Sequence, residues 1–102
     1  MVTNANGEKS QAQVAYITGG ASGMGLSVVE WLVERGWNVT IADLNAEAGQ
    51  KIAERLGEQA IFIKTDVADY ESQAKAFGET WSKWRRLDFV YANAVPKLHL
   101  KL

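Results

Sequence analysis

Short apolar runs alternate along this chain with longer segments of helical periodicity, and no other feature of the sequence constrains the fold as strongly. The apolar runs, which we predict to be strands, span 14–18, 38–42, 60–64 and 87–92. The periodic segments, which we predict to be helices, span 24–35, 45–57 and 69–86, the last two capped by Asn45 and Asp69. This order favours a parallel sheet with right-handed crossovers, and uninterrupted apolar strands suit a sheet covered on both faces. We therefore expect an α/β fold with four strands and three connecting helices.

The composition is that of an ordinary globular domain, and it argues against several classes of function. The 102 residues are 47% hydrophobic and 23% charged, which suits one domain at most. The net charge of -1 argues against a nucleic-acid-binding protein and against a polybasic patch for membranes. The chain has no cysteine, and no apolar run approaches the roughly 20 residues of a membrane span. Since no secretory signal pattern is present either, we expect a cytoplasmic protein.

A glycine-rich loop at residues 18–25 separates the first predicted strand from the first predicted helix. A phosphate in this place meets free backbone N–H groups and the positive end of the helix dipole. Gly19 permits a sharp turn, Gly23 lets a pyrophosphate approach the backbone, and Gly25 lets the helix pack close to the sheet. Ser22 adds a hydroxyl donor. The loop predicts a phosphate-binding site, with a plain glycine-rich turn as the alternative.

An acidic residue, Asp43, closes the second predicted strand 18 residues after Gly25. A carboxylate at about this spacing is placed to accept hydrogen bonds from the adenosine ribose hydroxyls of a dinucleotide. Its charge would also repel a 2′-phosphate, so Asp43 favours NAD over NADP as the cofactor. The alternative is a helix N-cap or a solvated turn carboxylate, because Asn45 lies beside it.

These motifs together resemble the short-chain dehydrogenase/reductase family over residues 13–94. The residues that carry the resemblance are Thr18-Gly19-x-x-x-Gly23-x-Gly25, Asp43, Asp66-Val67 and Asn93-Ala94. The resemblance implies a truncated Rossmann-type fold, that is, the N-terminal half of a doubly wound parallel sheet. It also implies an oxidoreductase that acts on alcohol or carbonyl substrates with NAD or NADP. In this family the Asp66-Val67 pair contacts the adenine, and Asn93-Ala94 lies beside the cofactor.

The candidate site predicted in this way consists of cofactor-binding residues, with no catalytic residue and no metal ligand. Its members are Thr18, Gly19, Ser22, Gly23, Met24, Gly25, Asp43, Leu44, Asp66, Val67, Asn93 and Ala94. The family pattern is not matched at Val95, which stands where the family has a glycine and the chain must turn tightly. None of the three tyrosines is followed four residues later by a lysine, so the catalytic Tyr-x-x-x-Lys is absent. We expect the chain alone to be inactive as an enzyme.

The two ends of the chain are expected to lie outside the partial NAD(P)-binding domain, which spans 13–94. Residues 1–12 have little to bury and are predicted to form a flexible leader. Residues 95–102 match no continuation of the family and are interpreted as a divergent tail, from a frameshift, a retained intron or a premature stop. The alternative is a short protein with an evolved terminus.

Two surfaces of the predicted fold bear on partners other than the dinucleotide. The strand at 87–92 would be an uncovered apolar edge, which predicts marginal stability and either self-association or pairing with a longer relative. A non-catalytic module that binds a dinucleotide or a family member is therefore the alternative function.

Helical spacing also predicts a face on the third helix that packs on the sheet, with an aromatic binding patch as the alternative. That face consists of Ala74, Phe77, Trp81 and Trp84.

Overall fold

The computed structural model describes residues 12–93, and within them the strands form one parallel sheet in the order β3-β2-β1-β4. The strands are β1 (Val14–Thr18), β2 (Asn38–Asp43), β3 (Ala60–Lys64) and β4 (Phe89–Ala92). The helices are α1 (Gly23–Glu34), α2 (Ala46–Leu56) and α3 (Tyr70–Trp84), and a short 3-10 helix, η1 (Gly57–Gln59), follows α2. The predicted α/β fold, a Rossmann-type sheet of four strands with three connecting helices, is confirmed. Three predicted parts lie outside the described residues: the leader except for Ala12, the residue Ala94, and the tail 95–102.

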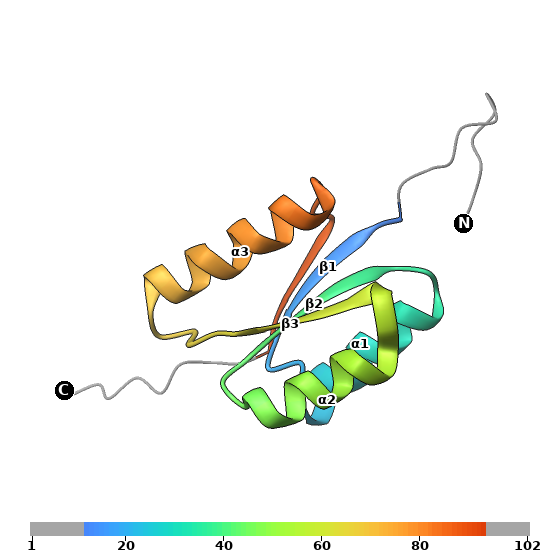
Figure 1. The fold of residues 1–102 in the computed structure, drawn as a ribbon, viewed down its shortest axis with the longest axis horizontal. Coiled ribbons are helices and arrows are strands. Elements are labelled where there is room, and N and C mark those ends of the chain that lie inside the picture. The colour runs from blue at the N-terminus through green and yellow to red at the C-terminus, as the bar shows by residue number, and fades with distance from the viewer. Residues whose placement is uncertain (1–11, 94–102) are drawn as a thin grey trace.

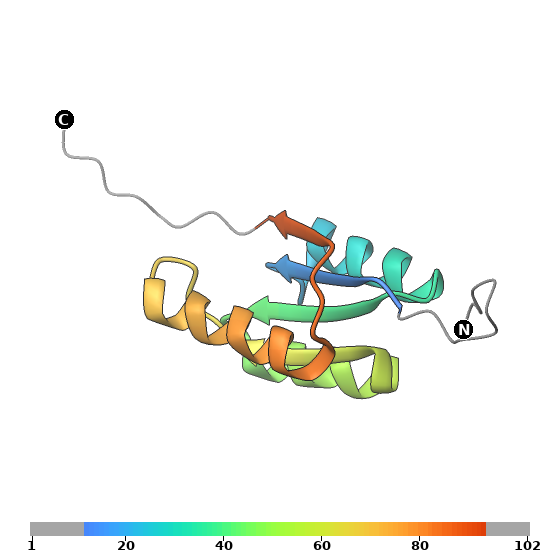
Figure 2. The same ribbon diagram turned by 90° about the horizontal axis from the view of Figure 1, so that it is seen from above.

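The sheet is covered by helices on both faces, as Figures 1 and 2 show, with α1 and α2 on one face and α3 on the other. All five residues of β1 are buried, because this strand lies between β2 and β4 and under both helical layers. Side chains that alternate along the strands feed two separate cores. Ala15 and Ile17 join the core against α1 and α2, whereas Tyr16 belongs to the core against α3.

Local residues set the starts of α2 and α3 and the end of α2 as the sequence predicted. The Asn45 side chain accepts a hydrogen bond from the Ala48 N–H at 3.1 Å, and Asp69 accepts one from the Glu71 N–H at 3.0 Å. Gly57 ends α2 with a φ of 75°, a left-handed conformation that glycine adopts without steric cost. The third helix ends at Trp84, two residues before its predicted end, because Arg85 adopts a left-handed φ of 54°.

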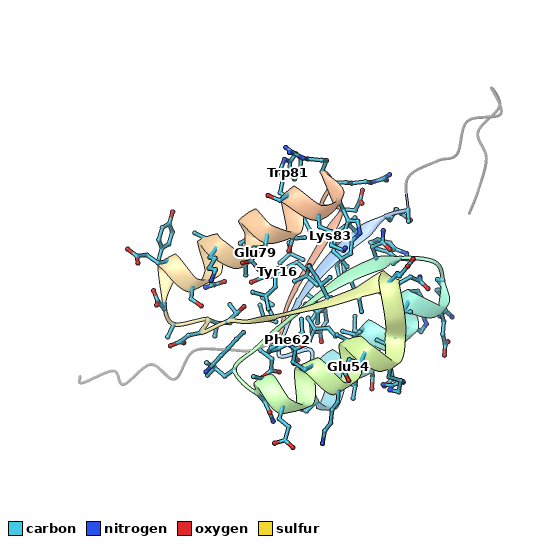
Figure 3. All side chains as sticks on the ribbon, viewed as in Figure 1. Tyr16, Glu54, Phe62, Glu79, Trp81 and Lys83 are labelled. Carbon is cyan, nitrogen blue, oxygen red and sulfur yellow. The ribbon has the colours of Figure 1, made fainter. Side chains whose placement is uncertain are left out.

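The face of α3 that packs on the sheet differs from the predicted one. Ala74 and Trp81 are exposed, Trp81 to 51%, and Figure 3 shows Trp81 on the outer side of the helix. Ala76 and Thr80 are the buried residues of α3, and Phe77 is partly buried in the same core. The prediction was wrong for Ala74 and Trp81 because it followed apolar residues alone. The polar Thr80 takes the core position, since its hydroxyl pairs with that of Thr40 on β2 at 2.8 Å.

The strand β4 forms one of the two edges of the sheet in the part of the chain that the structure describes. It pairs with β1 in parallel, and Phe89 and Val90 remain 40% and 45% exposed. Asp88, just before β4, accepts a hydrogen bond from the Val14 N–H and donates one from its own N–H to the Val14 carbonyl, both at 2.8 Å. Burial alone would raise the pKa of Asp88, but the hydrogen bonds from Arg86 and Val14 hold that pKa below its ordinary value. The start of β4 is thus tied firmly to β1.

No helix within residues 12–93 combines the length and the apolar character that crossing a bilayer would require.

Candidate functional site

The carboxyl ends of the strands meet at one edge of the sheet, and the loops that follow them form the candidate site. The chain passes from β1 to β2 on one side and later returns to β4 on the other side of β1. The strand order therefore reverses beside β1, and ligands of open α/β sheets bind outside the carboxyl ends at such a point. The glycine loop leaves β1 at this position.

The glycine loop turns sharply and leaves the start of α1 open. Gly19 has a φ of 65°, and its N–H donates to the Ala42 carbonyl on β2 at 2.8 Å. Ser22 occupies the N-cap position of α1 without a capping hydrogen bond from its side chain. Gly23 has a φ of 57°, and a Cβ built there would meet nothing within 4 Å. The first N–H groups of α1 have no partner within the helix itself, as at the start of any helix.

Gly25 and Asn93 close the other side of the loop. A Cβ on Gly25 would overlap the Gly19 carbonyl, so no larger residue fits while α1 holds this position. The Asn93 side-chain amide donates to the same Gly19 carbonyl oxygen at 3.4 Å, which links the end of β4 to the loop. Thr18 is buried at the end of β1, and its hydroxyl donates to the Tyr91 carbonyl at 3.4 Å. The first helix, the first strand and the fourth strand therefore all hold the loop.

The carboxylate of Asp43 lies directly against the glycine loop. Its Oδ2 accepts a hydrogen bond from the Ala21 N–H at 3.1 Å, and its Oδ1 accepts one from the Asn45 N–H at 3.0 Å. Of the predicted alternatives, the helix cap does not apply, because Asn45 is the cap of α2. The turn carboxylate does apply, because the bond from the Asn45 N–H, two residues on, is exposed and belongs to the turn after β2. Both bonds come from backbone groups, so the plane of the carboxylate is fixed while each oxygen keeps acceptor capacity.

A depression of about 90 Å³ lies between the ends of β1, β2 and β3, beside the loop. It is lined by Gly19, Ala42, Asp43, Leu44, Thr65 and Val67. Apart from the Asp43 carboxylate and the Thr65 hydroxyl, the lining side chains are apolar, and Leu44 is 58% exposed. Such a surface suits the flat face of an aromatic base with a polar group at its rim.

The predicted site residues do not all gather at this depression. Asp66 lies outside the lining; its carboxylate accepts from the Ala68 N–H at 2.9 Å and shapes the turn that carries Val67. Met24 is 71% exposed on the first turn of α1. Ala94 lies outside the described residues. Thr65 was not predicted, although its place directly before Asp66 was the available signal.

Tyr16 is a second residue near the site that the sequence did not indicate. Its side chain is fully buried between β1 and α3, where Figure 3 shows it, and its ring stacks on Phe77 with centroids 4.1 Å apart. Its hydroxyl makes no hydrogen bond within the described part of the chain. Burial raises the pKa of the Tyr16 phenol, and the nearby Thr65 hydroxyl offsets part of the rise. The Tyr16 and Thr65 hydroxyl groups are therefore close to each other.

Comparison with known proteins identifies related sequences over most of the chain. The model of the family described as short chain dehydrogenase matches residues 13–98. Tropinone reductase-like 1 of Erythroxylum coca is 38% identical over 87 residues, which cover 85% of this chain and 32% of that protein. The 3-beta-hydroxysteroid dehydrogenase of Comamonas testosteroni is 48% identical over 58 residues, which cover 57% of this chain and 23% of the relative.

A solved structure has a similar fold. A 3-ketoacyl-(acyl-carrier-protein) reductase from Brucella melitensis, complexed with NADH, superposes with a TM-score of 0.76 at 25% sequence identity. The superposition covers 78% of this chain and 33% of the reductase. The chain thus spans about a third of the length of the curated tropinone reductase-like relative and of this reductase.

Proposed function

Because the chain belongs to the short-chain dehydrogenase family, we propose that its residues hold the ADP portion of a nicotinamide dinucleotide. The activity served would be the oxidation of alcohols or the reduction of carbonyl compounds. The observation that carries this proposal is the hydrogen bond between Asp43 Oδ2 and the Ala21 N–H. It keeps the ribose-binding acid beside the phosphate-binding loop, and a dinucleotide requires the two groups together.

Each part of the nucleotide has a matching group at the carboxyl edge of the sheet. The N–H groups at the start of α1, next to Gly23, would hold the pyrophosphate with the help of the helix dipole. Asp43 would accept hydrogen bonds from the ribose hydroxyls, which favours NAD over NADP. Leu44, Thr65 and Val67 would surround the adenine. When the dinucleotide is bound, its nicotinamide supplies or accepts the hydride. The residues named here only bind and orient the dinucleotide.

A second function is supported by the exposed edge at β4. The sequence holds no Tyr-x-x-x-Lys, the motif that supplies the proton of the carbonyl oxygen in this family. The exposed side chains of Phe89 and Val90 give that edge an apolar character. The alternative proposal is a non-catalytic module that pairs with a longer family member through β4.

Titration of the 102-residue chain with ADP-ribose tests the main proposal, and two glycines make a matched pair of variants. Gly23 and Gly36 both have a left-handed φ, of 57° and 84°, and open space where a Cβ would stand. Alanine at either position therefore carries a similar backbone strain, about 1 kcal/mol. Only Gly23 lies in the proposed pyrophosphate site. We expect Gly23→Ala to weaken ADP-ribose binding at least tenfold, and Gly36→Ala to leave it unchanged.

Calorimetry measures both affinities, and circular dichroism confirms that the variants fold alike. Equal weakening by the two variants would mean that strain, not contact with the pyrophosphate, causes the loss. Absence of binding by the folded wild-type chain would contradict the proposal itself.

A further inference from the structure

Val67 lies farther along the chain from the end of its strand than any other residue that lines the depression. The other lining residues belong to a strand or directly follow one. Where they follow one, backbone hydrogen bonds tie the chain to the neighbouring strand. The Gly19 N–H donates to the Ala42 carbonyl at 2.8 Å, and the Thr65 N–H donates to the Asp43 carbonyl at 2.9 Å. The sheet therefore positions these residues directly, whereas Val67 needs another support.

The start of α3, which follows the loop after β3 (Figure 1), provides that support through the Gln73 side chain. Gln73 Nε2 donates to the Val67 carbonyl oxygen at 2.8 Å, and this bond is partly buried. The Gln73 N–H donates to the Asp69 carbonyl at 3.1 Å, so the helix holds Gln73 in turn. Ser72 makes a second link, because its hydroxyl accepts from the Asp66 N–H at 2.9 Å, but that bond is exposed. Water competes for an exposed bond, so Gln73 is the stronger of the two links.

We propose that Gln73 is a positioning residue for the base subsite, which keeps Val67 against the depression before a nucleotide binds. The proposal rests on the function proposed above. A hydrogen bond to the Val67 carbonyl fixes the peptide group that follows Val67. The base then meets a wall that is already in place, and binding does not have to order it. Without the bond, only a fraction of the molecules would hold this wall in place, and the apparent affinity would fall by that fraction.

Two glutamines allow the positioning role to be separated from a general loss of stability. Gln73→Met keeps the length of the side chain and removes its donor, and it should weaken ADP-ribose binding about three- to tenfold, the net value of one hydrogen bond. Gln59→Met is the matched control. Gln59 Nε2 also makes partly buried bonds to backbone carbonyls, those of Val33 and Trp37 at 3.2 and 3.1 Å, but it lies at the amino ends of the strands. Calorimetry should give the control the wild-type affinity, and an equal loss in both variants would overturn the proposal.

A double-variant cycle tests whether Gln73 acts through Val67. Val67→Ala removes most of the wall and should itself weaken ADP-ribose binding. Adding Gln73→Met to Val67→Ala should then cost less affinity than Gln73→Met costs in the wild type, because the side chain that Gln73 positions is already gone. Fully additive losses would mean that the two residues act independently and would overturn the proposal.

A nuclear magnetic resonance measurement on the isotope-labelled wild-type chain decides the matter even if a variant fails to fold. Saturation with ADP-ribose should shift the side-chain amide resonances of Gln73, whose acceptor belongs to Val67, and leave those of Gln59 in place. Unshifted Gln73 resonances at saturation would overturn the proposal, as would equal affinities of the wild type and Gln73→Met for ADP-ribose. In both cases the wild type still binds ADP-ribose, so the proposed function would stand. A folded wild type that does not bind ADP-ribose would contradict the proposed function and this inference together.

Discussion

At the scale of single residues, Asp43 combines two roles that require different properties of its carboxylate. Its two oxygens accept backbone hydrogen bonds from Ala21 and Asn45, which joins the glycine loop, the end of β2 and the start of α2. This role needs two acceptors. The proposed recognition of ribose needs the remaining lone pairs, and the proposed exclusion of a 2′-phosphate needs the negative charge. A neutral amide in this place would meet these requirements only in part.

We expect Asp43→Asn to reduce the discrimination between ADP-ribose and its 2′-phosphorylated form. The wild-type chain should prefer ADP-ribose by about tenfold or more, since hydrogen bonds to charged groups contribute about 1.5–3 kcal/mol and the added phosphate is repelled. The variant should lose about tenfold in affinity for ADP-ribose and little for the phosphorylated ligand. Calorimetric titration with both ligands measures the ratio.

Asp88→Asn makes the same change of net charge at the other end of the sheet, beside Val14, and serves as the control. An equal loss of discrimination in that variant would assign the effect to the overall charge of the protein. A wild-type chain that prefers the phosphorylated ligand would contradict the assignment of NAD.

The sequence predicted where Asp43 would lie, but it did not predict the neighbours of Tyr16. A charged residue directly after an apolar run must leave the core at the end of the strand, and parallel strands bring such ends to one edge. Tyr16 has no comparable local signal, because an aromatic residue inside a buried strand fits any core position. Its contacts with Phe77 and Thr65 join residues far apart in the chain, and only the packed structure brings them together.

At the scale of secondary-structure elements, glycines inside helices show how closely each helix approaches its neighbour. Gly49 in α2 faces the ring of Phe62 on β3, which Figure 3 shows on the α2 side of the sheet, and a Cβ on Gly49 would overlap that ring. A Cβ on Gly78 in α3, in contrast, would meet nothing within 4 Å. In an isolated helix the two glycines would lower stability by a similar amount. In this fold, however, only Gly49 is closely packed against a neighbouring side chain.

We expect alanine to have opposite effects on stability at these two positions. Gly78→Ala should raise the free energy of unfolding by about 0.5–1 kcal/mol, because alanine loses less backbone entropy in a helix. Gly49→Ala gains the same helix propensity but should lower that free energy by about 1–3 kcal/mol, because α2 must move away from Phe62. Urea unfolding followed by circular dichroism measures both. A stabilising Gly49→Ala would mean that α2 does not pack closely against β3.

The number and order of the elements were predictable from the sequence, but the buried face of α3 was not. Caps such as Asn45 and breaks such as Gly57 act within a few residues, so the sequence alone indicates them. The inward face of a helix depends on its partner as well. Thr80 is buried because Thr40 on β2 supplies a hydrogen-bond partner, and that outweighs the apolar character of Trp81, which stays exposed.

At the scale of the whole molecule, the two edges of the described sheet are unlike each other. The edge strand β3 has Ala60 and Ile63 buried, and α2 packs against it. The strand β4, in contrast, has exposed apolar side chains at Phe89 and Val90. Unpaired N–H and C=O groups next to apolar side chains are a template for pairing with another strand. We propose that β4 is where this chain associates with another strand.

Sedimentation velocity tests this proposal on the chain by itself. The wild type should form dimers or larger species as its concentration rises, and Val90→Lys should shift it toward the monomer, because a charge on an edge strand opposes pairing in the plane of the sheet. Trp81→Lys is the matched control, since it replaces another exposed apolar side chain by the same charge, on the outer side of α3. Dissociation by Trp81→Lys alone would assign the contact to the outer face of α3. A wild type that stays monomeric at high concentration would mean that the twist and shortness of β4 are sufficient to protect its edge.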